Sequence, residues 1–539
     1  MRYKFVFLTL ILAVYSEFLN SQVHSYHQNY RLEWGEMNRF RGNVDYLFDI
    51  ELNSFSALVN RTPAFNFFGS RTKHLKIKNI NNLNPSLQGK IELTGNDKPV
   101  TLQGVLDIGN KVVAFSKQTR LFNRTSDLFY HTFNHFNLNE NISGKLLGSY
   151  NRHSKFKNEF AMDFTHSLDQ KKGAAFYVIP SAQHDYPSVG YLIFDESLGL
   201  INEGLALLPY RANEFEVYDE HLTNNGDYYI IGKHYYPFIS VNKNREFDQL
   251  ELFKVEGNQI HKIKINQPDV RLRDMQITSD TEGNLFCTGF YTGTVSSQIT
   301  GVYFFKLDSK TQEIVNFTTS QVTVDFLSVD EPDIKEQFLL GRRFVSGRND
   351  FENYSFLDFR KTDDGGFVAI TENAELELRI KGSGESGNNS NDRYDLYYYY
   401  NDLLVYKLDS LGNIKWVNRI PKHQQSINDN AIHLSATNTM ANNKLYILFN
   451  DHRKNYDDNS EFIDMNFPKM STTSNRNNVI ALAEIDLMSG SLRRKALPGR
   501  AELSTVFIPS LSRENLKDNS LLLYSNHRNK HRFGKLNFQ

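Results

Sequence analysis

The sequence predicts an all-β fold, a β-propeller, from two observations. A hairpin unit recurs from about residue 100 to the C-terminus. Its strands are short β-branched and aromatic runs, and its turns are rich in Asn, Asp and Gly, which accept the positive φ of tight hairpins. Seven four-stranded blades are predicted, because first strands begin near residues 102, 160, 214, 271, 355, 430 and 503.

Each unit contains two hairpins. In the first, a polar turn such as Asp363–Gly366 precedes an apolar strand such as Phe367–Ile370. In the second, an alternating strand ends near an Asp, turns, and resumes with Ile or Leu, as from Leu403–Asp409 to Ile414. Alternation of apolar and polar residues is the pattern of a strand with two different faces.

The two ends of the chain are predicted to close the ring. The last unit is one strand short, and Gly89–Thr94 is placed to supply the missing outer strand. The propeller is therefore assigned to residues 89–539, after an N-terminal segment with extra strands at 22–88. Six or eight blades stay open, because residues 44–80 hold further strand-like runs.

The unit at 363–416 resembles that of secreted bacterial β-propellers with a DGGF…KLDxxGxIxW repeat. It carries Asp363-Asp364-Gly365-Gly366-Phe367, then Lys407-Leu408-Asp409 and Trp416. The resemblance covers about residues 100–538 and implies a propeller fold and export, but little about a ligand. The turn also resembles the Asp-box hairpin of sialidase-type propellers. Gly412 follows its Asp by three positions instead of two, so sialidase chemistry is not inferred.

The N-terminus predicts export. Arg2 and Lys4 precede an apolar stretch, Phe5–Tyr15, that is too short to span a bilayer, so residues 1–21 are interpreted as a signal peptide. The alternative is an uncleaved anchor. The expected location is the periplasm, the cell surface or the medium. The single cysteine, Cys287, allows no intramolecular disulfide. A net charge of −1 gives no bulk electrostatic reason to bind nucleic acid.

Long insertions point to one face of the ring. First and third turns are tight, whereas the extra residues fall between second and third strands or between blades. Antiparallel strands bring those connections to the same side. Long loops on a rigid scaffold are where binding usually occurs, although tolerated drift in loop length is the alternative. The insertions are 235–248, 328–354, 374–402 and 450–477.

Polar groups end three of the second strands at this face. They supply Asp, His and Arg side chains for acid–base work or anion binding, unless the similarity only repeats a turn. These candidate binding residues are His234, Asp451, His452, Arg453, His527 and Arg528. A tyrosine cluster in the insertion 374–402 offers rigid amphipathic surface for a glycan or a protein. Its members are Tyr394, Tyr397, Tyr398, Tyr399 and Tyr400, and an extension of the strand is the favoured alternative.

No metal or cofactor is predicted. The acidic stretch at 457–464 lacks the ordered spacing of an EF-hand loop. His131 and His135 fall in a strand-like run rather than on a helix face. No phosphate-binding loop, G-x-S-x-G or CxxC motif is present.

Three functions fit these observations, and a binding role is favoured over an enzymatic one. The first is an exported propeller that binds a glycan or an envelope protein through the insertion-bearing face. The second is a glycan-active hydrolase or lyase that uses carboxylates and His in the central channel, and a hydrolase would need an inward-facing pair of carboxylates. The third is a scaffold. Ligand identity and oligomeric state stay open.

Overall fold

The structure is a computed structural model that describes residues 30–539 with internal gaps. The gaps are 52–53, 61–74, 109–110, 121–124, 135–139, 152–161, 180–185, 236–248, 266, 294–298, 323–353, 382–392, 464–467, 474 and 516–518. The predicted signal peptide therefore lies outside the described residues. So does the insertion 235–248, except for its first residue, and the insertion 328–354, except for its last.

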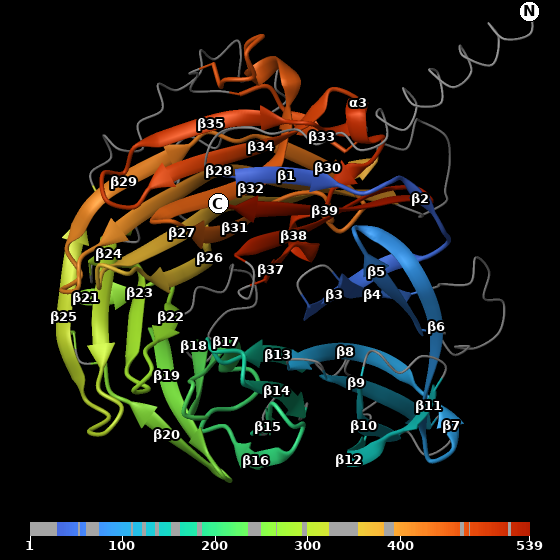
Figure 1. Ribbon diagram of the computed structural model, residues 1–539. Coiled ribbons are helices and arrows are strands. Elements are labelled where there is room, and N and C mark those ends of the chain that lie inside the picture. Colours follow the sequence, from blue (N-terminus) through green and yellow to red (C-terminus); the bar gives the residue numbers. More distant parts are fainter. Residues whose placement is uncertain are drawn as a thin grey trace, which may run out of the picture.

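The described strands form eight sheets, called blades 1–8 in chain order (Figure 1). Blade 1 contains β3 (Asn43–Glu51), β4 (Ser54–Asn60), β5 (Leu75–Asn81) and β6 (Asn84–Gly95), with β7 (Lys98–Pro99) and β11 (Glu140–Ser143) at its edge. Blade 2 contains β8 (Thr101–Ile108), β9 (Lys111–Arg120), β10 (Thr125–Asn134) and β12 (Lys145–Asn151). Blade 3 contains β13 (Met162–His166), β14 (Lys172–Ile179), β15 (Ser188–Asp195) and β16 (Leu200–Leu207). Blade 4 contains β17 (Phe215–Leu222), β18 (Tyr228–His234), β19 (Gln249–Glu256) and β20 (Gln259–Ile263).

The second half of the chain builds the other four blades. Blade 5 contains β21 (Val270–Leu272), β22 (Gln276–Ser279), β23 (Leu285–Gly293), β24 (Ile299–Leu307) and β25 (Ile314–Gln321). Blade 6 contains β26 (Tyr354–Lys361), β27 (Phe367–Lys381), β28 (Arg393–Leu408) and β29 (Ile414–Ile420), extended by β30 (Gln424–Ile427) and β33 (Ser471–Thr472). Blade 7 contains β31 (Ala436–Ala441), β32 (Lys444–His452), β34 (Asn478–Asp486) and β35 (Leu492–Leu497). Blade 8 contains β36 (Val506–Phe507), β37 (Arg513–Asn515), β38 (Ser520–His527) and β39 (Lys530–Phe538), joined by β1 (Tyr30–Trp34) and β2 (Asn38–Arg39). Three short helical turns complete the described chain: η2 (Arg453–Asn455), α3 (Arg500–Leu503) and η3 (Pro509–Leu511).

An N-terminal strand closes the ring, but it is not the one predicted. Tyr30–Trp34 pairs antiparallel with β39, from Tyr30 opposite Phe538 to Trp34 opposite Gly534. Gly89–Thr94 instead belongs to β6, the fourth strand of blade 1. The prediction that this segment completes the last blade is therefore wrong. The described residues form eight sheets rather than seven, because the strand-like runs at 44–80, which left eight blades open, build blade 1.

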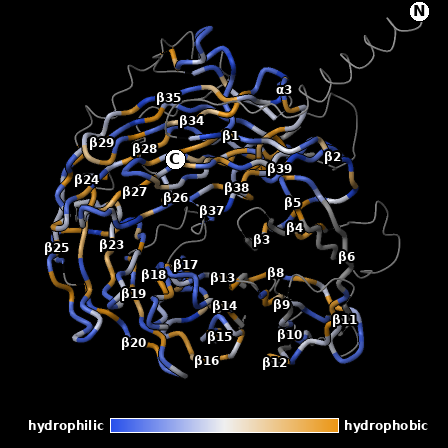
Figure 2. The backbone as a smooth tube through the Cα atoms, viewed as in Figure 1, coloured by the Kyte–Doolittle hydropathy of each residue, from blue (hydrophilic) through white to orange (hydrophobic). Residues whose placement is uncertain are grey.

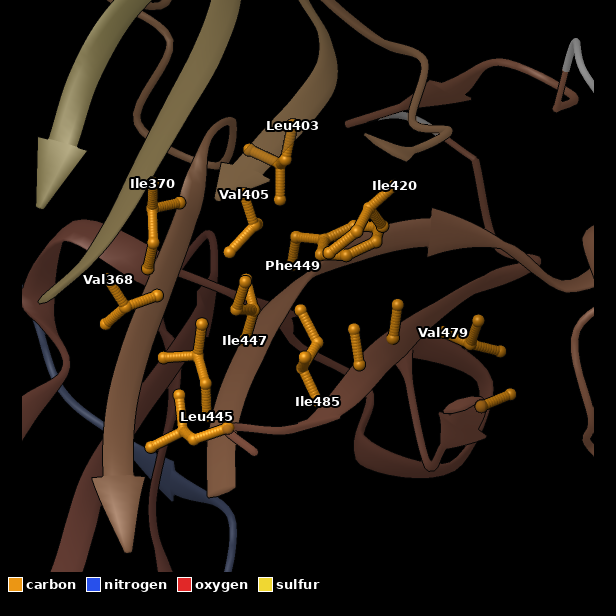
Figure 3. Packing of buried hydrophobic residues seen from close by; sticks show 14 of the residues in the cluster. Val368, Ile370, Leu403, Val405, Ile420, Leu445, Ile447, Phe449, Val479 and Ile485 are labelled. Carbon is orange, nitrogen blue, oxygen red and sulfur yellow. The ribbon is translucent and has the colours of Figure 1, made fainter. Parts of the chain in front are cut away.

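Buried apolar clusters join every blade to the next. Eight clusters fill the seams between consecutive blades, and one of them joins blade 8 back to blade 1. Figure 3 shows the seam of blades 6 and 7, where Ile370 and Val405 lie beside Ile447 and Ile485. Each fully buried side chain of this size contributes on the order of 1.5–3 kcal/mol relative to exposure. Figure 2 shows hydrophobic residues distributed along strands around the whole ring.

The residues of the repeat motif hold blade 6 together and attach it to blade 7. Lys407 forms an ion pair with Asp364, the second Asp of the DGGF turn, and donates to the Leu487 carbonyl of blade 7 at 2.8 Å. The indole nitrogen of Trp416 donates to the same carbonyl at 3.2 Å. The Lys407 ammonium lowers the pKa of Asp364 to about 2. The motif thus has a structural role in this chain.

Recurring aspartates fix the hairpin turns. Asp409 Oδ1 accepts the N–H groups of Leu411 and Asn413 at 3.0 and 2.9 Å, an Asx turn that replaces hydrogen bonds the turn cannot make itself. Gly412 in this turn has a φ of +88°, a conformation that disfavours other residues. Asp195 and Asp280 repeat the same contacts in other blades.

Two of the insertions form one continuous layer with a blade-to-blade link. The β27–β28 hairpin extends well beyond the blade, and β30 in the link pairs with its Tyr397–Tyr400 stretch. β33, in the insertion 450–477, then pairs in parallel with β30. The face that carries second-to-third connections is therefore a built surface over blades 6 and 7.

Candidate anion-binding site

Three segments meet on the insertion-bearing face where blades 7 and 8 adjoin. They are the link that carries α3, the insertion 450–477 and the turn after β38. Arg500 begins α3, and its Nη1 donates to the Thr473 carbonyl at 2.8 Å. A second contact reaches the Asn475 carbonyl at 3.4 Å. Two backbone carbonyls of the insertion therefore hold the guanidinium in place.

His527 and Arg528 end the second strand of blade 8 beside Arg500. His527 Nε2 lies 3.2 Å from Arg500 Nη2. A guanidinium only donates, so the imidazole nitrogen accepts and the ring is neutral. Burial, followed by the charges of Arg500, Arg528 and Lys530, lowers the pKa of His527. Arg528 occupies the turn with a φ of +59° and is exposed.

Arg476, Arg500, His527 and Arg528 form what we call the cationic cluster. Burial, then the charges of Arg476 and Arg528, lowers the pKa of Arg500. Within the part of the chain that the structure describes, none of these four residues forms an ion pair with a carboxylate. Like charges without counter-charges repel, and planar guanidinium groups bind carboxylate, sulfate or phosphate through paired hydrogen bonds.

The cationic character continues across blade 8. Arg39 of β2 lies directly opposite Lys530 of β39 in the strand register. Like charges at opposed positions of a strand pair are destabilising. The cluster and this pair therefore make a positive strip along the insertion-bearing face.

The other polar strand end, at 451–453, is structural. Asp451 is fully buried, forms an ion pair with Arg494, and accepts from the Tyr456 hydroxyl at 2.7 Å. His452 caps η2, since its Nδ1 accepts the Lys454 N–H at 3.1 Å. Arg453 donates to the Asp457 carbonyl at 2.9 Å. The interpretation of these three residues as surface binding groups is therefore not supported, because each is engaged in shaping the loop.

His234 lies apart from the cluster, at the end of β18 in blade 4. Its ring lies 4.3 Å from the ring of Tyr210, centroid to centroid, at 34°. The structure therefore brings together only His527 and Arg528 of the six polar residues predicted to bind.

The tyrosine cluster is a strand extension, as the favoured alternative proposed. Tyr397 and Tyr399 share one face of the β27–β28 hairpin, where Arg379 stacks 4.2 Å above the Tyr397 ring and donates to Tyr399 Oη at 2.7 Å. Tyr394 and Tyr398 share the other face with Leu376 and Leu378. Tyr400 lies nearer the blade, with the Lys422 ammonium 5.8 Å from its ring.

One face of this hairpin is apolar and open to solvent. Leu376 and Leu378 are each 61% exposed, and Tyr394 is 49% exposed. Exposed apolar patches on a soluble domain mark surfaces for protein contact.

Arg476 and Arg500 were not identified from the sequence. They lie in different loops from His527, and their proximity depends on how blades 7 and 8 dock. The available signal was the Asn526-His527-Arg528 strand end alone. His131, considered for zinc, is a buried strand residue with Nε2 2.7 Å from Ser116 Oγ and a pKa that burial lowers to about 4. His135 lies outside the described residues.

Among the described residues, no group of three or more His, Cys, Asp or Glu side chains could hold a metal ion. The helices described here include none of sufficient length and apolar character to span a bilayer.

No protein-family model matches the chain, and no curated protein matches it. Solved structures with a similar fold include the β-propeller domain of the Trilobed protease from Pyrococcus furiosus, with 11% identity, a TM-score of 0.32, and coverage of 84% of this chain and 98% of that one. The Nup133 β-propeller domain of Vanderwaltozyma polyspora shows 10% identity, a TM-score of 0.32, and coverage of 81% and 99%. The polysaccharide lyase Uly1 shows 10% identity, a TM-score of 0.36, and coverage of 87% and 95%. At such identities and scores no activity is transferred to this chain.

Proposed function

We propose that this protein is an exported β-propeller that binds an acidic glycan, one carrying carboxylate or sulfate groups, through the cationic cluster. The observation that carries the proposal is the environment of Arg500. Its guanidinium is partly buried beside two further arginines and a neutral histidine, and it is anchored by backbone carbonyls. Such a group is preorganised for an anion, since its geometry is fixed before a ligand arrives.

The location of the cluster also favours a polymeric ligand. Arg39 and Lys530 continue the positive strip beyond Arg528, so successive acidic groups of one chain can meet successive cations. Export, predicted from residues 1–21, would place the protein among glycans rather than nucleic acids.

Binding to polygalacturonate and to an uncharged glucan of similar length would test this proposal. The protein lacking residues 1–21 is expected to bind the acidic polymer alone, with affinity that falls as salt rises, because salt screens exposed charges. The double variant Arg500→Gln, Arg528→Gln should bind at least tenfold more weakly. Lys310→Gln, which removes an exposed cation from a third turn on the opposite face, is the matched control. The proposal would be contradicted if the wild type bound both polymers equally. It would also be contradicted if the double variant bound polygalacturonate as tightly as Lys310→Gln does.

A second candidate is a protein partner, favoured by the apolar face of the β27–β28 hairpin. Leu376, Leu378 and Tyr394 could pack against another envelope protein without disturbing the blade. When envelope extract is passed over the immobilised wild-type protein, a partner protein should be retained. The immobilised double variant Leu376→Ser, Leu378→Ser should not retain it. Because both leucines are exposed, the variant should keep its unfolding midpoint. Identical retention by wild type and variant would remove this candidate.

A further inference from the structure

A second charged region, of opposite sign, lies on the first strands of blades 3–5. The first strand of each blade is nearest the ring axis, and β13, β17 and β22 are neighbours there (Figure 1). Asp163 lies on β13, Asp219 and Glu220 lie on β17, and Asp274 precedes β22. We call these four carboxylates the acidic cluster.

The strand register places Glu220 and Asp163 at the same seam. Glu220 is opposite Ile230, which packs in the cluster between blades 3 and 4. Asp163 is opposite Phe176, a member of that same cluster. Directly opposed residues of an antiparallel pair share a face, so both carboxylates are directed toward this seam.

Asp219, the neighbour of Glu220, is directed the other way. It is opposite Ile231, which packs between blades 4 and 5. Asp274 lies on that side, where its Oδ1 accepts from the Tyr218 hydroxyl at 2.7 Å. A register shift between Val217 and Asp219 marks a β-bulge at Tyr218, and bulges of this kind re-aim side chains.

Two of the four carboxylates, Glu220 and Asp219, are poorly compensated. Burial, with further contributions from Asp163 and Asp219, raises the pKa of Glu220 to about 8. Burial, with Asp274 and Asp163, raises the pKa of Asp219 to about 6. Asp163, which is exposed, and Asp274, which is buried, also have raised pKa values, mainly through desolvation. The charged forms of Glu220 and Asp219 therefore lack nearby opposite charges that would stabilise them.

The chain itself supplies one ammonium to this region. Lys233 Nζ lies 3.7 Å above the centre of the Tyr218 ring, and its charge lowers the pKa of Asp274. A cation held over an aromatic face next to a carboxylate is a known mode of ammonium recognition.

A buried hydroxyl provides an independent indication of a ligand. Tyr228 is 1% exposed, and its hydroxyl has no hydrogen-bond partner. It shares the face of Glu220, and its ring lies 6.2 Å from that of Phe176, centroid to centroid. Phe176 is the residue opposite Asp163, so Tyr228 faces the same seam as Glu220 and Asp163. Burial raises the pKa of Tyr228 well above its ordinary value, with further contributions from the charges of Glu220, Asp163 and Asp219. An unsatisfied buried hydroxyl costs about 1–3 kcal/mol, which a ligand atom would recover.

We propose that the acidic cluster binds an organic cation carrying primary amines. An ammonium has three donors, enough for two carboxylates and the Tyr228 oxygen. A metal ion is a poorer fit, because no three acidic or imidazole side chains converge among the described residues. This site is separate from the cationic cluster and does not depend on the acidic-glycan proposal.

Calorimetric titration with spermidine, above the Glu220 pKa of about 8, tests the inference. Spermidine is expected to bind, whereas sodium chloride at equal ionic strength is not. Glu220→Gln with Asp219→Asn should weaken binding at least tenfold. Glu203→Gln, on the exposed outer strand β16, should leave it unchanged.

Lys233→Gln gives a test of opposite sign. Removing the chain's own ammonium should tighten spermidine binding several-fold, an outcome that damage to the fold cannot mimic. The inference is overturned if spermidine produces no heat beyond the salt control. It is also overturned if the Glu220 and Asp219 changes have no effect, or if calcium binds in place of the amine.

Discussion

The cationic cluster of blades 7 and 8 and the acidic cluster of blades 3–5 are opposite in sign but alike in construction. Each gathers like charges from neighbouring blades. In each, burial shifts a pKa in the direction that disfavours the charged form: it lowers the pKa of Arg500 and raises the pKa of Glu220. They differ in position: one lies among the long connections of a face, the other on strands nearest the axis (Figure 1). A net charge of −1 conceals both. Local charge therefore says more about ligands than the sum does.

The largest expected effect comes from breaking a buried ion pair, compared with breaking an exposed one. Asp451→Asn should destabilise the protein by about 3–5 kcal/mol, because Arg494 would stay buried without its counter-charge. Urea denaturation measures this change. Arg493→Gln, which removes an exposed partner of Glu461, should cost no more than about 1 kcal/mol. Similar losses in the two variants would mean that burial does not distinguish these pairs.

Glu220→Gln should stabilise the protein at alkaline pH, by on the order of 2–4 kcal/mol. The folded-state pKa of about 8 exceeds the ordinary 4.5, so the wild type loses stability as pH rises from 4.5 to 8. The variant lacks this loss, and the difference should vanish at pH 4. The charges of the neighbouring Asp163 and Asp219 are coupled to that of Glu220, which broadens the transition. A constant difference across this range would show that Glu220 is not shifted.

Tyr218→Phe should cost about 1–2 kcal/mol near neutral pH. The change removes the hydroxyl that donates to buried Asp274 and leaves that carboxylate with the Met275 N–H at 2.8 Å. Because this hydrogen bond lowers the pKa of Asp274, the cost should shrink in acid, where the carboxyl is protonated. Thermal unfolding against pH measures both effects. Tyr186→Phe, at an exposed tyrosine, should be neutral throughout.

The smallest expected effect is on the stability of the protein without any ligand. Arg528→Gln should stabilise it by a few tenths of a kcal/mol at low salt, since one of three neighbouring arginines is removed. High salt should abolish the gain. Precise denaturation curves at two salt concentrations suffice. A loss of stability at low salt would indicate that Arg528 has an attractive partner, and would weaken the parallel between the clusters.

The hairpin repeat was sufficient to predict most of the fold. First strands predicted near 102, 214 and 355 begin at 101, 215 and 354, because the turn residues and alternation that define them act locally. The closing strand could not be predicted in the same way. Tyr30–Trp34 and Gly89–Thr94 both alternate apolar and polar residues, and alternation does not say which sheet edge a strand will join.

The site was less predictable than the fold for a related reason. The buried Asp451 receives its counter-charge across the sheet from Arg494, forty-three positions later. His527 acquires Arg500 as a neighbour from another loop. Such pairings depend on how blades dock, and no local pattern records them. The strand end at His527 and Arg528 carries no sign of the arginines that lie near it in space.

The pairing of β1 with β39 also governs the order of events in biosynthesis. The ring seals through Tyr30 opposite Phe538, so the first described strand must await nearly the last residue of the chain. During synthesis the partly made ring exposes the edge of an unfinished sheet, which is prone to pair with other chains. A chain exported unfolded would seal only after its C-terminus had crossed. In that case, chaperone demand should last until β39 has crossed the membrane.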